Sequence, residues 1–258
     1  MTSEQSPQKA GIGKLGLCSG CSYYPDLLNR HRCTPGDACI RAHSGRQIDR
    51  FLRNNQELAE NYLADIFWER RAIAARYAPV ERIFDLKSDP DEVVRRVIAM
   101  RMPVEQLVGM IGDPDREVRL SVAARLPEAL LVQMIRDPDY LIRATVARRL
   151  PHGQLAKLVK DPEREVRKVV ASRLPAFALH MLADDDEPEV RAIVAERALP
   201  GLAVALLQDS EWWVRLAAVG NAPMEFLPPL LDDPEVEVRE AALARLAEEQ
   251  STGNKEIR

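Results

Sequence analysis

The chain has 258 residues, of which 46% are hydrophobic and 29% charged, with a formal net charge of −4. This length suits one large domain or two small ones, and the weak negative charge argues against a general nucleic-acid-binding protein. No apolar run approaches the ~18 residues of a membrane span, and the polar start MTSEQSPQKAG lacks a secretory signal, so we expect a cytoplasmic protein without a membrane segment.

The chain begins with a segment, residues 1–13, that we expect to be flexible, and with the motif GIGKLG at residues 11–16. This motif matches G-x-G-x-x-G, but a dinucleotide-binding fingerprint needs a strand before it and a helix after it. Here the preceding residues are polar and include Pro7, and the following residues run into the first cysteine. We interpret the motif as a flexible approach to the next segment.

That next segment, residues 14–44, holds every cysteine of the chain: Cys18, Cys21, Cys33 and Cys39. In a reducing compartment, four clustered thiols with the spacing C-x2-C-x11-C-x5-C predict a metal site, because buried structural cysteines would not gather in this way. Gly20 gives the first pair room to curl around a metal. The metal is either zinc or a [4Fe–4S] cluster, and the wide second spacing favours the cluster slightly. We interpret His31 and His43 as bystanders.

Residues 45–64 are expected to form a helical connection, with apolar contacts at Phe51, Leu52, Leu58, Tyr62 and Leu63. Residues 65–247 then carry a repeat with a period of 24 residues. Its first residue, position 0, is an aspartate at 89, 113, 137, 161, 185, 209 and 233, with a fainter copy at Asp65. Residues 248–258 are polar, and we expect a flexible tail.

Each repeat reads D-P-(D/E)-x-x-V-R-x-x-V-A-x-R-L-P-x-x-x-L-x-x-L. The aspartate suits a helix N-cap and the proline the first helical position, while apolar residues at positions 5, 9, 10 and 13 have helical spacing. A second proline ends this helix after about three turns, and apolar residues follow at positions 18 and 21. The remaining short segment can return alongside a ~18 Å helix only if it rises ~2 Å per residue, as a 3₁₀ helix does.

Two arginine series accompany the repeat. The arginines at position 6 fall on the apolar face, where a charge must be paired, so we expect a structural ladder of acid–arginine pairs between repeats, with the position-2 acid as partner. The arginines at position 12 fall at the flank of that face, where we expect snorkelling side chains; a phosphate-binding stripe is the alternative. The position-12 series is Arg101, Arg125, Arg149, Arg173, Arg197 and Arg245, with Asn221 interrupting it.

The 24-residue repeat behind a four-cysteine module resembles the leucine-rich repeat variant proteins, over nearly the whole chain. The resemblance implies an all-α, right-handed solenoid of alternating α and short 3₁₀ helices. It also implies a [4Fe–4S] cluster on Cys18, Cys21, Cys33 and Cys39. It supplies no activity.

No catalytic constellation is evident, so we expect a non-enzymatic iron–sulfur protein whose solenoid binds a protein partner, with a role in redox sensing or electron transfer. Residues 1–60 carry a net charge of +2, residues 61–183 of +4 and residues 184–258 of −10. Because the front of the chain is basic, we expect an acidic partner to bind there in a salt-sensitive way. The alternative is a zinc- or cluster-bearing nucleic-acid-binding solenoid that uses the arginine stripe.

Overall fold

The computed structural model describes residues 16–253, which form helices and turns and no β-strand. The predicted flexible N-terminus, residues 1–13, lies outside the described residues, as does the glycine motif except for Gly16. The predicted tail begins inside the last helix, α12 (Val236–Gly253), and residues 254–258 lie outside the described range. No helix among the described residues is both long enough and apolar enough to span a lipid bilayer.

The repeats alternate α-helices with short, mostly 3₁₀, helices. The α-helices are α2 (Asp26–Asn29), α3 (Gly45–Asn54), α4 (Trp68–Tyr77), α5 (Glu92–Arg101), α6 (Arg116–Arg125), α7 (Tyr140–Arg149), α8 (Arg164–Arg173), α9 (Pro188–Arg197), α10 (Pro200–Leu206), α11 (Trp212–Val219) and α12. The 3₁₀ helices are η1 (Gly16–Cys18), η2 (Gln56–Tyr62), η3 (Val80–Arg82), η4 (Phe84–Ser88), η5 (Val104–Met110), η6 (Glu128–Met134), η7 (His152–Leu158), η8 (Ala176–Leu182), η9 (Met224–Phe226) and η10 (Pro228–Asp232).

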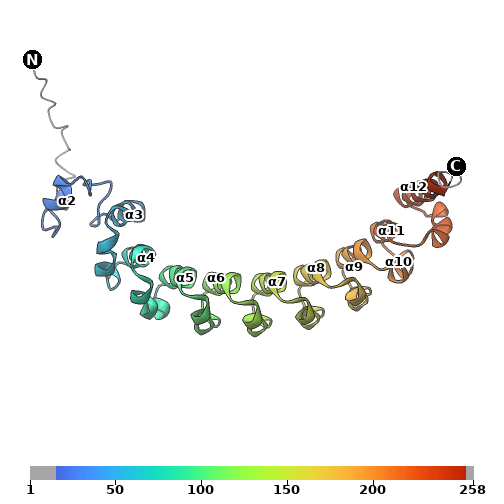
Figure 1. Cartoon of the computed structure of the whole chain (residues 1–258), viewed down its shortest axis with the longest axis horizontal. Coiled ribbons are helices and arrows are strands. Elements are labelled where there is room, and N and C mark those ends of the chain that lie inside the picture. Colours follow the sequence, from blue (N-terminus) through green and yellow to red (C-terminus); the bar gives the residue numbers. More distant parts are fainter. Residues whose placement is uncertain (1–15, 254–258) are drawn as a thin grey trace, which may run out of the picture. The chain divides into compact units, whose positions relative to one another are not determined.

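The chain forms two compact units, unit 1 ending at Arg125 and unit 2 starting at Leu126. In unit 1, helices α3 to α6 pack side by side in chain order; in unit 2, α7, α8, α9, α11 and α12 do the same. In unit 1, α3 to α6 form one row, and in unit 2, α7 to α9, α11 and α12 form one row; within each unit the short helices, α10 among them, form a second row (Figure 1). This arrangement confirms the predicted all-α solenoid. The predicted connection at residues 45–64 consists of α3 and η2, so the same alternation already starts there.

The core of each repeat comes from the predicted apolar positions. In the repeat from Asp137, positions 5, 9, 10 and 13 are Ile142, Val146, Ala147 and Leu150, and each is 0% exposed. Positions 18 and 21 of the 3₁₀ helix close the layer with Leu155 and Leu158. The α-helix is only ten residues long, so tertiary packing of this apolar face, more than helix propensity, stabilises it.

The predicted N-cap is wrong by two residues. Where the position-2 acid is an aspartate, it caps the helix: Asp91 Oδ1 accepts hydrogen bonds from the backbone N–H groups of Val93 and Val94, at 2.9 and 3.4 Å. The glutamates at this position, such as Glu163 and Glu187, occupy the N-cap without a side-chain cap hydrogen bond. The position-0 aspartate instead accepts the N–H of that acid, as Asp89 Oδ1 does from Asp91 at 2.9 Å. The repeats from Asp185 and Asp209 have no proline at position 1, yet their helices also begin at position 3, so the later start does not depend on that proline.

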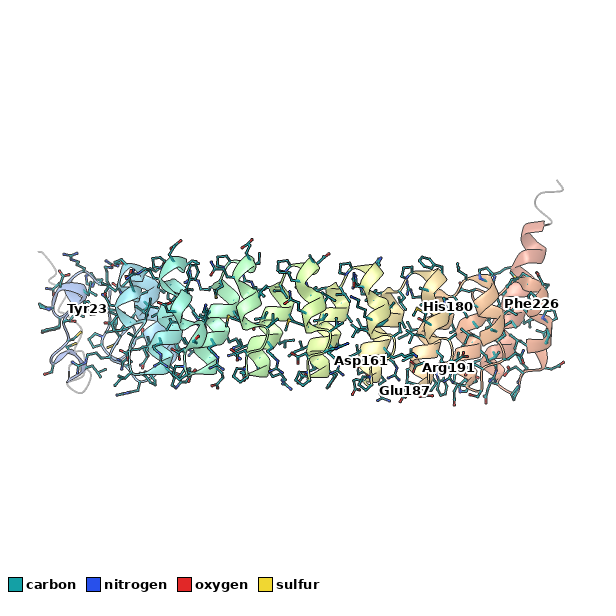
Figure 2. The ribbon with its side chains drawn as sticks, turned by 90° about the horizontal axis from the view of Figure 1, so that it is seen from below. Tyr23, Asp161, His180, Glu187, Arg191 and Phe226 are labelled. Carbon is teal, nitrogen blue, oxygen red and sulfur yellow. The ribbon has the colours of Figure 1, made fainter. Side chains whose placement is uncertain are left out.

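The position-6 arginines form the expected ladder, but their partner is the position-0 aspartate of the following repeat. Arg143 donates through Nε and Nη2 to the two carboxylate oxygens of Asp161, at 2.7 and 2.9 Å. Its Nη1 donates to the carbonyls of Asp137 and Pro138 in its own repeat. The position-2 acid of this repeat, Asp139, instead accepts the backbone N–H of Leu141 at 2.8 Å. Figure 2 shows Asp161, Glu187 and Arg191 along one edge of unit 2.

The ladder couples neighbouring repeats through charge-assisted, bidentate hydrogen bonds. Equivalent bonds join Arg71 to Asp89, Arg95 to Asp113, Arg167 to Asp185, Arg191 to Asp209 and Arg215 to Asp233. The hydrogen bond from Arg215 holds the pKa of the Asp233 carboxyl below its usual range, although burial opposes this. The same bond raises the pKa of Arg215. Both partners therefore stay ionised over the physiological pH range.

The position-12 arginines cap the preceding repeat, a role that sequence reasoning missed. Arg173 Nη1 donates to the carbonyls of Ala147 and Leu150, at 2.6 and 2.8 Å, near the C-terminal end of α7. Asn221 takes the same place and donates to the carbonyl of Ala195 at 2.9 Å. Because the last turn of a helix leaves its carbonyls unpaired, each repeat satisfies the end of the one before it. These guanidinium groups lie between repeats. Their regular spacing along the chain is therefore explained by capping, and no phosphate ligand is needed to explain it.

One short segment departs from the 3₁₀ pattern. In the repeat from Asp185 the second proline stands one place late, at Pro200, and the segment is an α-helix, α10. Proline is well tolerated at the first position of an α-helix, since its missing N–H would have no intrahelical partner there. The one-residue shift observed in the sequence therefore coincides with a local change of helix type.

Candidate metal centre

The first cysteine pair lies on a tight turn after η1. The N–H of Cys21 donates to the carbonyl of Cys18 at 3.1 Å. Gly20 adopts φ +70°, a left-handed conformation in which a side chain is strained. Arg41 donates to the carbonyl of Ser19 and so holds the turn from the opposite side. The turn thus presents both thiols from a short stretch of chain, as the C-x2-C spacing predicts.

The second pair is brought together by a small loop. The N–H of Thr34 donates to the carbonyl of Ala38 at 2.9 Å, and these two residues form an antiparallel bridge. Cys33 precedes this bridge and Cys39 follows it, so the five intervening residues are closed into a loop. Gly36, with φ +75°, turns the chain at its tip. The C-x5-C spacing, wide as a linear pattern, is short in space because of this bridge.

All four thiols line one small cavity. They are free cysteines, and each is half-buried. The cavity is otherwise walled mainly by apolar and aromatic side chains: Leu17, Tyr23, Tyr24, Pro35, Ala38, Ile40 and Phe51. Within residues 16–253, no three His, Cys, Asp or Glu side chains come close enough together to form a site for a single metal ion. The thiols are arranged around the cavity wall.

The thiols act on one another electrostatically. Burial raises the pKa of the Cys33 thiol, and the three other cysteines raise it further. Burial also raises the pKa of Cys18, as do Cys39 and Cys21, while Arg41 opposes the shift. Four thiolates around one cavity therefore repel each other unless a positive centre lies among them. A metal centre has this charge, and thiolate sulfur is the ligand preferred by iron–sulfur clusters and by zinc.

The cavity is attached directly to the first repeat helices. Phe51 of α3 is 1% exposed and forms one wall, against the ring of Tyr23 at a centroid distance of 5.8 Å. The hydroxyl of Tyr62, on η2, donates to the Tyr23 hydroxyl at 3.1 Å. Next to Cys33, Arg32 donates to the carbonyl of Asn54 at the end of α3. The module and the solenoid therefore share side chains at the cavity.

The two histidines near the cysteines do not line the cavity. His31 is exposed and adopts φ 55°, and His43 is also exposed. Sequence reasoning did not find the aromatic walls Tyr23 and Phe51. It also missed the loop closure, for which the dipeptide Pro35-Gly36 was an available signal, since proline followed by glycine is typical of a tight turn.

Known families match two parts of the chain. A family described as "LRV protein FeS4 cluster" matches residues 12–61, which include all four cysteines and the wall residue Phe51. A second family, described as "Leucine rich repeat variant", matches residues 116–139, the length of one repeat. The first match extends through α3 and most of η2, so the family treats the module and the first helices as one segment.

Two individual proteins are also similar. A curated relative, an uncharacterized 27.7 kDa protein in the nifB 3′ region of Rhodobacter capsulatus, is 40% identical over 89 residues; the match spans 34% of this chain and only 36% of the relative. A solved structure described as "a leucine-rich repeat variant with a novel repetitive protein structural motif" is 55% identical, with a TM-score of 0.84. It covers 89% of this chain and 98% of that one.

Proposed function

The chain belongs to the leucine-rich repeat variant family, and from that premise we propose that Cys18, Cys21, Cys33 and Cys39 hold a [4Fe–4S] cluster. We propose further that the protein is not an enzyme and that its solenoid binds a protein partner, so that the cluster serves redox sensing or electron transfer. The family match to the cysteine segment makes the chain an iron–sulfur repeat protein. The cluster type and the role are our proposals.

The observation that carries the cluster type is the single cavity lined by four free thiols. A [4Fe–4S] cluster takes one thiolate for each iron, so its ligands stand apart around a cubane, whereas the four sulfurs of a zinc site meet at one ion. Thiols spread over a cavity wall fit the first arrangement better. When bound, the cluster would supply reversible one-electron chemistry.

The remaining residues of the cavity have separate roles. Phe51, Ile40 and Ala38 exclude water, which in iron–sulfur proteins influences the reduction potential. The bridge between Thr34 and Ala38 closes the loop whose ends carry Cys33 and Cys39. Arg41 places a positive charge beside Cys18, which favours its thiolate form.

The chemistry of the proposed partner is inferred from the distribution of charge along the chain. Residues 1–60 and 61–183 have net charges of +2 and +4, while residues 184–258 have −10. An acidic partner would therefore be attracted to the part of the chain that carries the cysteine module, and salt would slow its association. Such a partner would stand close to the cluster. Free thiols are maintained in reducing compartments, and we therefore propose a cytoplasmic location.

The test is metal and sulfide analysis of protein purified without oxygen. We expect iron and acid-labile sulfide in equal amounts, a brown colour and a broad visible absorption that bleaches on reduction. Stoichiometric zinc without sulfide would contradict the cluster and support a zinc module. A control is needed for incomplete loading of the purified protein. For this control, the protein is acid-denatured and refolded, and is then incubated with iron and sulfide under the same conditions.

A further inference from the structure

The α-helix row of unit 1 carries a groove of about 720 Å³ across α4, α5 and α6. Its lining includes the apolar residues Val93, Val97, Met100, Leu120 and Ala124 together with four arginines. Apolar side chains dominate the floor, and arginines stand among them. The groove is separate from the cysteine cavity.

Comparison of the repeats shows that the exposed residue Met100 is unusual. Met100 stands at position 11 and is 58% exposed. In the following repeats the same position carries small, polar or charged residues: Ala124, Arg148, Ser172, Glu196 and Gly220. A long apolar side chain at this exposed position is therefore particular to α5. Exposed methionines of this kind are typical of surfaces that bind peptides.

The groove is also strongly positive. Four arginines line it against a single carboxylate, Glu117, which already pairs with Arg116 at 2.9 Å. Arg101 donates to the carbonyls of Ala75 and Ala78, which are neutral, so its charge is not compensated. Arg125 is held in the same way.

Arg96 has no hydrogen bond or ion pair among the described residues, although it lies half-buried on the floor. Arg76 is 53% exposed and reaches Asp49 only at 3.7 Å. These two guanidinium groups can receive carboxylates from outside. A groove that is apolar and cationic at once fits a ligand that is apolar and anionic at once.

We propose that this groove binds an acidic amphipathic helix of a partner protein. Packed helices lie about 8–10 Å apart, and an α-helix advances about 10.5 Å per heptad. Apolar residues repeated every seventh position would therefore meet α4, α5 and α6 in turn, with glutamates of the same helix beside Arg76 and Arg96. Such helix-in-groove binding is a common mode of peptide recognition. An extended nucleic acid would gain little from the aliphatic floor, which has no ring for base stacking.

The groove leads toward the cysteine module. A neighbouring cavity shares Arg76 and Val93 with it and continues to Gly45 and Asp49 of α3. The same helix carries Phe51, a wall of the cysteine cavity. This inference rests on the proposed function, since it names the site and the chemistry of the acidic partner. A bound helix would lie beside the helix that supports the cluster.

The experiment measures fluorescence anisotropy of a labelled peptide against the full-length, cluster-loaded protein at low salt. The probe is three repeats of the heptad Leu-Glu-Glu-Leu-Leu-Glu-Ala. Two comparison probes are a scrambled peptide of the same composition, which lacks the apolar stripe, and a single-stranded oligonucleotide of similar charge. The variants are Arg96→Glu and Met100→Ser. Arg148→Glu is the matched control, because Arg148 lines a groove of about 490 Å³ on the α-helix row of unit 2.

We expect the amphipathic peptide to bind in the micromolar range and the scrambled peptide at least about tenfold more weakly. Arg96→Glu should weaken binding by roughly tenfold or more and Met100→Ser by several-fold, while Arg148→Glu should have little effect. Equal binding of both peptides, an equal effect of Arg96→Glu and Arg148→Glu, or tighter binding of the oligonucleotide would overturn the proposal. Iron content and helical circular dichroism are measured on each sample. Unchanged iron with no peptide binding therefore rejects only the groove, and absent iron rejects only the cluster.

Discussion

In the repeat that starts at Asp137, eight apolar residues of 24 are buried; in the described part of the cysteine module, residues 16–44, only Leu27, Ala38, Ile40 and Ala42 are. The repeat closes its own layer with regularly spaced aliphatic side chains and passes an ionic link to the next repeat. The module has too little apolar surface to do this, and segments of its size usually need a metal or disulfides. We therefore expect the repeats to hold together through their periodic apolar side chains and the module to depend on a bound metal centre.

The substitution with the largest expected effect on the difference between module and repeats is Cys33→Ser. A serine hydroxyl is a hard, weakly acidic ligand, and the loop closed at Thr34 would lose its attachment to the metal. We expect near-complete loss of iron and of visible absorption. The helical circular dichroism should change little, because each repeat contacts mainly its neighbours.

Ser22→Ala, a nearby substitution outside the cavity wall, is the control for Cys33→Ser and should retain the metal. Retention of a full complement of iron by the Cys33 variant would remove this residue from the ligand set. Collapse of the helical signal would show that the repeats depend on the module for folding.

The substitution with the second-largest expected effect is Arg143→Leu, in a repeat of unit 2. This change leaves Asp161, which is 7% exposed, as a buried carboxylate without its bidentate partner. Removal of one member of a buried pair costs about 3–5 kcal/mol. Denaturant unfolding should show this loss in the free energy of unfolding. The double variant Arg143→Leu with Asp161→Leu should recover part of it, and failure to recover any would mean that the arginine acts through its carbonyl contacts.

A smaller effect is expected from Arg173→Leu. It removes two carbonyl caps at the end of α7 but creates no buried charge, so the free energy of unfolding should fall by about 1–3 kcal/mol. Arg173→Asn should cost less, because Asn221 at the same repeat position still reaches one carbonyl. If leucine and asparagine proved equally costly in equilibrium unfolding, carbonyl capping would not be the role of this series.

The smallest expected effect is on the stability of the fold at low pH. The folded-state pKa values of Asp89 and Asp233 are lowered, so their ionised forms stabilise the fold above the unfolded-state pKa of ~3.9. This stability is lost as the pH falls from there through the lower folded-state pKa. The melting temperature should therefore fall steeply as the pH drops below about 4. The fall should be shallower in Arg215→Leu, because this variant lacks the partner of Asp233. The same slope in both proteins would disconnect acid sensitivity from the ladder.

The same contrast explains what the sequence could predict. Periodicity identified the buried positions, such as Ile142 and Leu155, because burial at a helical spacing leaves a pattern in the residues themselves. It assigned the partner of Arg143 incorrectly, since a contact 18 residues apart depends on how one repeat lies on the next. It also placed the N-cap two residues too early, which is a local error in the start of the helix. For the candidate centre, clustering alone pointed to the four cysteines. The walls Tyr23 and Phe51 could not be predicted, because they come from irregular chain and from a different helix.

The central claim is that a ligand-dependent module is attached to repeats that hold themselves together. Hydrogen exchange of the cluster-loaded protein, compared with the same protein after removal of the metal by a chelator, tests it most directly. We predict that protection is lost in residues 16–44 and in the part of α3 around Phe51, and is retained from α4 onward. Loss of protection throughout both units, or no loss within residues 16–44, would contradict the account.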